Sequence, residues 1–326
     1  MMVKNSLCRF SMALSAISAL ILPTGCHHKD LLYEEPDDRK VIVVFDWRDA
    51  PDADPASMVA YLYRADGLDY YRYILPGRDG GEIKIPAGAY TAIGLNSDNI
   101  DWAQYRGEDD TESIEILTRD ATELAVSRLR TLQLPRAKEA ENERLAEAPG
   151  MLWSARADNV ALPDEPGVTY VTLRPSEAVC HYSVDVLNVS NIQSLDGSQT
   201  DATLSGMAEG FFDGKQQPSD QKVTMPFLLT ADRTSSSLHA DFLTFGECPD
   251  SRYPHHITFY VCLTDGSKRY YSVDVSSQVS DAPDPRHVHI VIDGLELPHE
   301  GTQGGGGLIP TVDDWNETDI NIDMGT

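Results

Sequence analysis

The most suggestive spacing of metal-ligand side chains in this sequence is His287-Val288-His289. Residues two apart on a β-strand share a face at about 6–7 Å, so two such histidines can chelate one metal ion when a third ligand approaches. The earlier pair His255-His256 is the candidate third ligand. The apolar residues at 288, 290 and 292 form the expected core face, which leaves the histidines facing solvent. We therefore predict no metal and no other cofactor, and keep His287 and His289 only as candidate ligands.

Other signatures of catalysis do not emerge from the sequence. The Gly304–Gly307 run lacks the lysine and hydroxyl residue that follow a phosphate-binding loop. A Gly-x-Ser-x-Gly nucleophile turn is missing as well. Paired acids such as Asp109-Asp110 are expected by chance in a chain this acidic, and adjacent strand residues point to opposite faces. The sequence therefore predicts a protein that is not an enzyme and has no catalytic residues.

The N-terminal 25 residues have the pattern of an export signal. Lys4 and Arg9 precede an uncharged apolar stretch, Phe10–Leu22, which is shorter than the ~20 residues that span a bilayer. The following Gly25-Cys26 resembles the lipobox of bacterial lipoproteins, although Pro23 stands where leucine is usual. We expect a signal peptide over 1–25 and lipidation at Cys26. The alternative is an ordinary secretory signal in which the cysteine is incidental.

Charge then limits what the exported protein can contact. The chain has 26 Lys and Arg residues against 52 Asp and Glu residues among 326, a formal net charge of −26. Such a body repels phosphate backbones and anionic lipid headgroups, so nucleic-acid binding is excluded and membrane attachment requires the acyl chains on Cys26. Residues 26–39 form an acidic tether, which resembles the segment that marks surface-exposed lipoproteins of Bacteroidota. The predicted location is the outer membrane, exposed at the cell surface.

Three cysteines remain after the signal peptide and Cys26 are set aside. They are Cys180, Cys248 and Cys262. In an oxidising compartment an odd number permits one disulfide at most, with Cys248 and Cys262 the nearer pair. Three buried thiols are the alternative.

Short alternating apolar segments separated by turn residues predict an all-β fold that positions these side chains. Clear examples are Val41–Phe45, Met58–Tyr63, Tyr70–Leu75, Glu82–Ile85 and Ala89–Gly94 in the first half, and Val168–Leu173, Ala178–Val189, Lys222–Leu229, Leu238–Phe245, Ile257–Leu263, Arg269–Val275 and His287–Leu295 in the second. Strands this closely spaced are typical of sandwiches.

The domain organisation follows from interruptions in this alternation. Residues 119–148 are rich in Ala, Glu, Leu and Arg and predict a short helical insertion, divided by Pro135. The Pro163–Gly167 segment is the best boundary between two β-sandwich domains, at 40–162 and 163–298. Residues 299–326 contain a glycine hinge and one or two terminal strands, within Leu308–Val312 and Ile320–Met324.

Tyrosines are concentrated on two neighbouring strands. Tyr61, Tyr63, Tyr70, Tyr71 and Tyr73 lie within 13 residues of one another. An exposed group of this kind offers stacking faces for sugars or peptides. Cross-strand packing that stabilises a sheet is the commoner reason for such a group.

Several structural motifs together resemble a known family. They are the lipoprotein cysteine Cys26, the segment Val43–Trp47 followed by Met58 and Tyr61–Tyr63, the segment Ile85–Tyr90 leading to Asn96–Asp98, Phe245-Gly246 before Leu263–Gly266, and the closing Val312–Trp315. The chain resembles the fimbrillin-like lipoproteins of Bacteroidales, which include the anchor and accessory proteins of type V fimbriae. The resemblance implies two transthyretin-like, Greek-key β-sandwiches on a lipid tether.

This resemblance also implies a function. We expect a non-enzymatic fimbrial anchor, accessory or adhesion component that contacts fimbrial or other surface proteins through β-strands, in addition to the outer-membrane lipid reached by acylated Cys26. The competing hypothesis is a surface glycan-binding lipoprotein of a nutrient-uptake system, which would require an exposed aromatic platform.

Overall fold

The computed structural model describes residues 38–67, 69–98, 101–126, 134–249, 254–299 and 316–317. These residues form mainly β-strands, which confirms the all-β class predicted from the alternating segments. Cys26 and the predicted signal peptide lie outside the described residues, as do most of the predicted tether, the predicted glycine hinge and both predicted tail strands. No helix among the described residues is long and apolar enough to cross a membrane.

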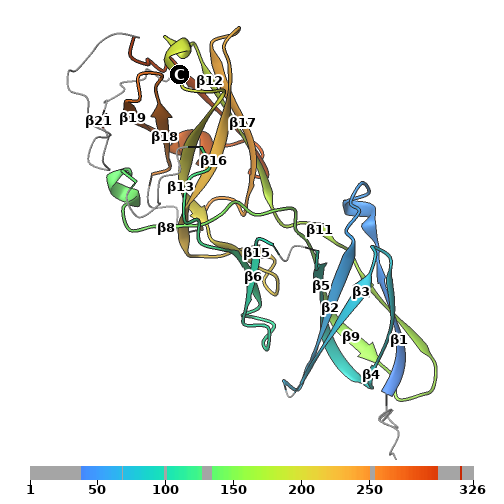
Figure 1. Ribbon diagram of the computed structural model, residues 1–326. Coiled ribbons are helices and arrows are strands. Elements are labelled where there is room, and N and C mark those ends of the chain that lie inside the picture. Colours follow the sequence, from blue (N-terminus) through green and yellow to red (C-terminus); the bar gives the residue numbers. More distant parts are fainter. Residues whose placement is uncertain are drawn as a thin grey trace, which may run out of the picture. The chain divides into compact units, whose positions relative to one another are not determined.

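The first sandwich contains two sheets around one hydrophobic core (Figure 1). Its smaller sheet has the order β10-β1-β4, and its larger sheet has the order β11-β9-β5-β2-β3. The strands are β1 (Asp38–Phe45), β2 (Ser57–Arg64), β3 (Tyr70–Pro76), β4 (Gly80–Pro86), β5 (Gly88–Asn96), β9 (Trp153–Leu162), β10 (Val168–Leu173) and β11 (Ser176–Glu177). Alternate residues of β1, including Val41 and Val43, are buried because successive side chains point to opposite faces.

The second sandwich repeats this plan. The order β20-β12-β17 forms one side and β16-β13-β18-β19 the other, and the end of β16 pairs with β17 to join them. The strands are β12 (Cys180–Leu187), β13 (Gln199–Ala208), β16 (Lys222–Asp232), β17 (Ser237–Thr244), β18 (His256–Cys262), β19 (Lys268–Asp274) and β20 (His287–Asp293). Short strands β8 (Arg144–Leu145) and β21 (Asn316–Glu317) pair with β16 and β19, and helix α1 (Ser276–Ser280) precedes β20.

Corresponding strands of the two sandwiches have the same partners. The first strand of each pairs in parallel with the last, β1 with β10 and β12 with β20. The second strand lies between the third and the fifth, since β2 is flanked by β3 and β5 and β13 by β16 and β18. The sixth strand, β9 or β19, pairs with the fifth. The two units are therefore copies of one seven-strand arrangement.

A third, four-stranded sheet combines strands from both halves of the sequence. Its order is β15-β14-β7-β6, with β6 (Ala103–Arg106) and β7 (Glu115–Thr118) from the first half and β14 (Gly210–Phe212) and β15 (Gln217–Pro218) from the second. The two halves of the chain are thus hydrogen-bonded into one ladder between β7 and β14.

Two details of the predicted organisation need correction. Strand β10 was expected in the second domain, beyond the Pro163–Gly167 boundary, but it pairs with β1 in the first sandwich. The predicted helical insertion at 119–148 has, in its described residues, only the 3₁₀ turn Lys138–Ala140 as a helical element, and its strand β8 joins the second sandwich. Pairing between strands far apart in the sequence decides both outcomes, and local sequence does not reveal such pairing.

None of the three cysteines among the described residues forms a disulfide. Cys248 is buried, and burial raises the pKa of the Cys180 and Cys262 thiols. The alternative of three thiols therefore describes this structure, rather than a Cys248–Cys262 bridge.

Candidate functional site

Four histidines lie on the outer face of the sheet β20-β12-β17. His287 and His289 are exposed on β20, whereas Val288, Ile290 and Ile292 are buried, as the alternation predicts. His287 Nδ1 lies 2.9 Å from Asp284 Oδ2, and the ring of His287 stacks on that of His181 with centroids 5.2 Å apart. With His239, these side chains define what we call the histidine face.

Asp185 lies at the centre of the histidine face. Its two carboxylate oxygens are 2.7 Å from His239 Nδ1 and 2.8 Å from His289 Nε2. The hydrogen bonds to His239 and His289 lower the pKa of Asp185. The hydrogen bond to Asp185 in turn raises the pKa of His239. The candidate third ligand, His255, is buried elsewhere, where its ring bonds Ser205 O and Glu247. Within the described part of the chain, no three histidine, cysteine or acidic side chains are placed to hold a metal ion.

Substituting both candidate ligands should therefore change little. We expect His287→Ala with His289→Ala to alter the free energy of unfolding by less than about 1 kcal/mol, because exposed ion pairs contribute at most that much. Urea unfolding measures the change, and elemental analysis of the purified protein measures bound metal. Stoichiometric zinc that disappears in the double variant would contradict the prediction.

The tyrosine cluster packs across strands β2 and β3, with Tyr61 and Tyr63 buried and Tyr70 39% exposed. The rings of Tyr61, Tyr63 and Tyr70 stack with centroids 5.5–6.4 Å apart, and the side chains of Tyr61 and Tyr63 are buried. The Tyr61 hydroxyl donates to Glu108 Oε2 at 2.5 Å, and the Tyr63 hydroxyl donates to the Glu108 carbonyl at 2.9 Å. Burial raises the pKa of both tyrosines. This is cross-strand packing, and the two buried rings offer no face to a sugar.

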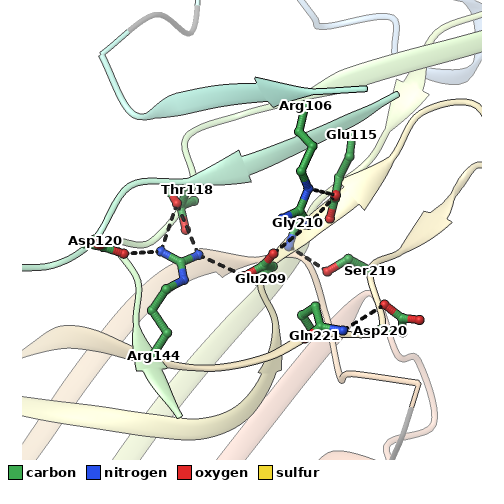
Figure 2. A network of polar contacts seen from close by, with 10 residues as sticks. All are labelled: Arg106, Glu115, Thr118, Asp120, Arg144, Glu209, Gly210, Ser219, Asp220 and Gln221. Atoms are coloured by element: carbon green, nitrogen blue, oxygen red, sulfur yellow. Dashed lines mark hydrogen bonds and ion pairs between the residues drawn. The ribbon is translucent and has the colours of Figure 1, made fainter. Parts of the chain in front are cut away.

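A network of arginines and carboxylates lies beside the four-stranded sheet (Figure 2). Arg106 on β6 donates from Nε to Glu115 Oε2 on β7 at 2.7 Å and from Nη2 to Glu209 Oε1 at 2.7 Å. Arg144 on β8 reaches the other oxygen of Glu209 at 3.3 Å and Asp120 at 2.6 Å. The network therefore connects segments from both halves of the chain. Because each guanidinium is bound to carboxylates, we assign the network a structural role.

Asp213 is a third buried carboxylate beside this network. It follows β14, is fully buried, and neither of its carboxyl oxygens has a hydrogen-bond partner within normal geometry. Burial raises its pKa to about 7; the negative Glu115 adds to the shift, and the nearby Ser154 hydroxyl opposes it only in part. An unpaired buried carboxylate is costly, so this group holds a proton around neutral pH.

Most strand edges of the two sandwiches are protected. The side-chain amide of Gln278 in α1 donates to Val291 O at 2.9 Å and accepts from Val291 N at 2.8 Å, which closes part of the β20 edge. The Tyr73 hydroxyl donates to the Lys84 carbonyl of β4. Other strand edges are paired with short strands: β9 with β11, β16 with β8 and β19 with β21. Such devices prevent unwanted pairing with other chains.

Comparison with known proteins finds a curated relative that aligns with almost the whole chain. This relative, named as a candidate fimbrium anchoring subunit, Fim4B, of Bacteroides ovatus, is 24% identical over 343 residues, covering 94% of this chain and 96% of the relative. It bears out the resemblance to fimbrillin-like lipoproteins. The packing of the tyrosines was predictable from their spacing, whereas the arginine network joins Glu209 to arginines 65 and 103 positions away and has no local motif.

One solved structure supports the fold. A candidate adhesin from Bacteroides ovatus superposes with a TM-score of 0.63 at 18% identity, covering 86% of this chain and 100% of that one. The fimbrial anchor protein Mfa2 from Porphyromonas gingivalis gives a TM-score of 0.45 at 16% identity, covering 78% and 90%. A family model described as a domain of unknown function, DUF5119, matches residues 25–228, which is more than half of the sequence. The chain belongs to the DUF5119 family.

Proposed function

We propose that this protein is a non-enzymatic cell-envelope lipoprotein that serves as a fimbrial anchor, accessory or adhesion component. The observation that carries the proposal is the end-to-end similarity to Fim4B, which is named as a fimbrium anchoring subunit and aligns over 94% of this chain and 96% of its own length. A role in binding other surface proteins also suits a protein built mainly of β-strands, because main-chain hydrogen bonds between strands supply affinity.

Lipidation at Cys26 forms part of this proposal. The Gly25-Cys26 sequence at the end of an uncharged apolar segment supports it, and the net charge of −26 gives the folded body no attraction to anionic lipid. Acyl chains would then hold the protein at the outer membrane, with the acidic tether between the lipid and the first sandwich.

Replacing Cys26 with serine is expected to release the protein from the membrane fraction. The reason is that acylation requires the cysteine thiol, and each buried acyl CH₂ contributes about 0.8 kcal/mol to membrane binding. Cell fractionation with immunoblotting measures the distribution, and Cys262→Ser, which changes a cysteine of the second sandwich, is the matched control. A Cys26→Ser protein that remains membrane-bound would overturn the lipidation claim.

Glycan binding, the competing hypothesis, is weakened by the burial of two of the five tyrosines that suggested it, although Tyr70 is 39% exposed. Tyr61 and Tyr63 are 0% and 5% exposed, so their rings cannot stack on a sugar.

A deletion strain tests the fimbrial role. If the protein anchors fimbriae, cells lacking it should shed fimbrial subunits into the medium, and the wild-type gene should restore cell-bound fimbriae while Cys26→Ser should not. Immunoblots of cells and cell-free medium provide the measurement. An unchanged amount of cell-bound and shed subunit in the deletion strain would contradict an anchoring role.

A further inference from the structure

Strand β10 forms an edge of the sheet β10-β1-β4. The Leu173 carbonyl accepts a hydrogen bond from Asp46 N at 2.8 Å, so the main chain of Leu173 faces the β1 side. Since main-chain direction alternates along a strand, Val168, Tyr170 and Thr172 direct their N–H and C=O groups toward the open side. No strand among the described residues pairs with that side of β10.

The side chains of the same three residues point outward. Val168 is 49% exposed and Tyr170 is 68% exposed, and Thr172 is also exposed. In the parallel register with β1, Tyr170 lies opposite Ile42 and Thr172 opposite Val44, both of which are only half-buried. An uncovered strip of apolar side chains therefore runs beside the unpaired main chain.

Strand β10 lacks the protection found at other edges. Its counterpart in the second sandwich, β20, has Gln278 on its outer main chain. The edge strand β3 carries a charge at its centre, Arg72, whereas the six residues Val168–Leu173 contain no charge and no proline. An exposed, uncharged edge rich in β-branched residues is a template for strand addition.

Charge identifies the kind of segment that fits. The exposed Asp164 and Glu165 lie just before β10. Arg39 lies beside them and donates from Nη2 to the Asp164 carbonyl at 2.7 Å. Lys40, opposite Val168, is paired with Glu82. Two carboxylates against the Arg39 guanidinium leave the beginning of the edge negative. A second copy of this chain is disfavoured as the occupant because two bodies with a net charge of −26 each repel one another. A segment of another chain with a basic residue at the matching end would be attracted instead.

We propose that the open edge of β10 binds an extended segment of a different protein, with apolar side chains at alternate positions and a basic residue beside Asp164 and Glu165. That this different protein is a surface or fimbrial protein rests on the proposed function. The segment extends the sheet by one strand, and its apolar side chains cover Val168, Tyr170 and Ile42.

Amide hydrogen exchange followed by NMR tests the proposal on the folded protein. The probe is a synthetic peptide of alternating valine and threonine with two lysines at one end. In the free protein the amides of Val168, Tyr170 and Thr172 should exchange rapidly, and the amides of Thr169 and Val171 slowly. Added peptide should protect the three fast amides, whereas a peptide N-methylated at alternate residues should not, because it cannot complete the ladder.

A charge on the edge should abolish this protection. Tyr170→Lys is expected to weaken peptide binding at least about tenfold, as edge lysines do in natural sheets. The matched control is Ile74→Lys, because Ile74 is 60% exposed on the edge strand β3. Thermal unfolding of both variants establishes that they fold. Equal binding by wild type and Tyr170→Lys, protection of all five amides in the free protein, or concentration-dependent dimers that protect β10 would each overturn the proposal.

The two proposals can fail separately. If the peptide protects β10 but no fimbrial subunit co-purifies with the protein from native envelopes, the binding edge stands and the fimbrial function fails. If fimbrial subunits co-purify equally with wild type and Tyr170→Lys and the peptide gives no protection, the function stands and the β10 site is wrong.

Discussion

Replacing Asp213 with asparagine is expected to raise the free energy of unfolding by about 2–4 kcal/mol at pH 8. The carboxyl group is fully buried and has no hydrogen-bond partner within normal geometry, and its pKa is raised from 3.8 to about 7. Above pH 7 the folded protein must bury the charged form. Asparagine removes that charge at nearly constant volume, although its amide group also lacks partners and reduces the gain.

The sign of the pH dependence follows from the direction of the shift. Because the folded pKa of Asp213 lies above the unfolded value, the folded state binds the proton more tightly, so this group costs no stability below about pH 4. The cost grows as the pH rises from about 4 to 7 and is constant above that range. The benefit of Asp213→Asn should therefore be absent at pH 4 and complete at pH 8.

Urea unfolding at several pH values measures this benefit. Asp220→Asn is the matched control, because Asp220 is exposed and the chemical change is the same. A destabilised Asp213→Asn protein at pH 8 would show that the carboxylate is paired and charged in the folded state. A stabilisation that is independent of pH would show that folding does not shift the pKa of Asp213.

The second large effect is expected at Arg106, whose replacement by alanine should reduce the free energy of unfolding by about 2–3 kcal/mol at pH 8. The change removes the partner of Glu115, which is 1% exposed and whose Oε1 already lacks a hydrogen bond. This expected loss of stability is smaller than the loss on breaking a fully buried ion pair, because the Arg106 side chain is 51% exposed and water screens part of the interaction.

Glu115 provides the internal control for this variant. Burial raises the pKa of Glu115 even with Arg106 present, so without Arg106 the carboxyl should take up a proton more readily and the loss should shrink at pH 5. Adding Glu115→Gln to Arg106→Ala should recover part of the stability at pH 8. If the two substitutions are simply additive and both destabilising, the pair does not have the coupling that the structure implies.

The sequence predicts strands well where one face is apolar and fails where buried positions are polar. Alternation located β2, β4 and β12 to within about two residues, which is the usual uncertainty of such boundaries. Strand β13 was missed although it lies at the centre of its sheet, because Thr200 and Asp201 are both polar and buried.

Distant partners explain why a polar strand can be buried. The Thr200 hydroxyl donates to the Tyr260 carbonyl at 3.0 Å, and Asp201 accepts from Val126 N at 3.1 Å. Those contacts exist only in the folded chain. Glu115 and Asp213 were missed for the same reason, since in an acid-rich sequence a buried carboxylate looks like a solvated one. The exposure of His287 and His289 was predictable, because it follows from alternation alone.

The most direct test of the fimbrial role is quantitative mass spectrometry of proteins that co-purify with the tagged full-length protein from its native cell envelope. The account predicts fimbrial subunits in stoichiometric amounts with wild type and with Ile74→Lys, and their loss with Tyr170→Lys. A sugar-uptake porin in place of fimbrial subunits would contradict it.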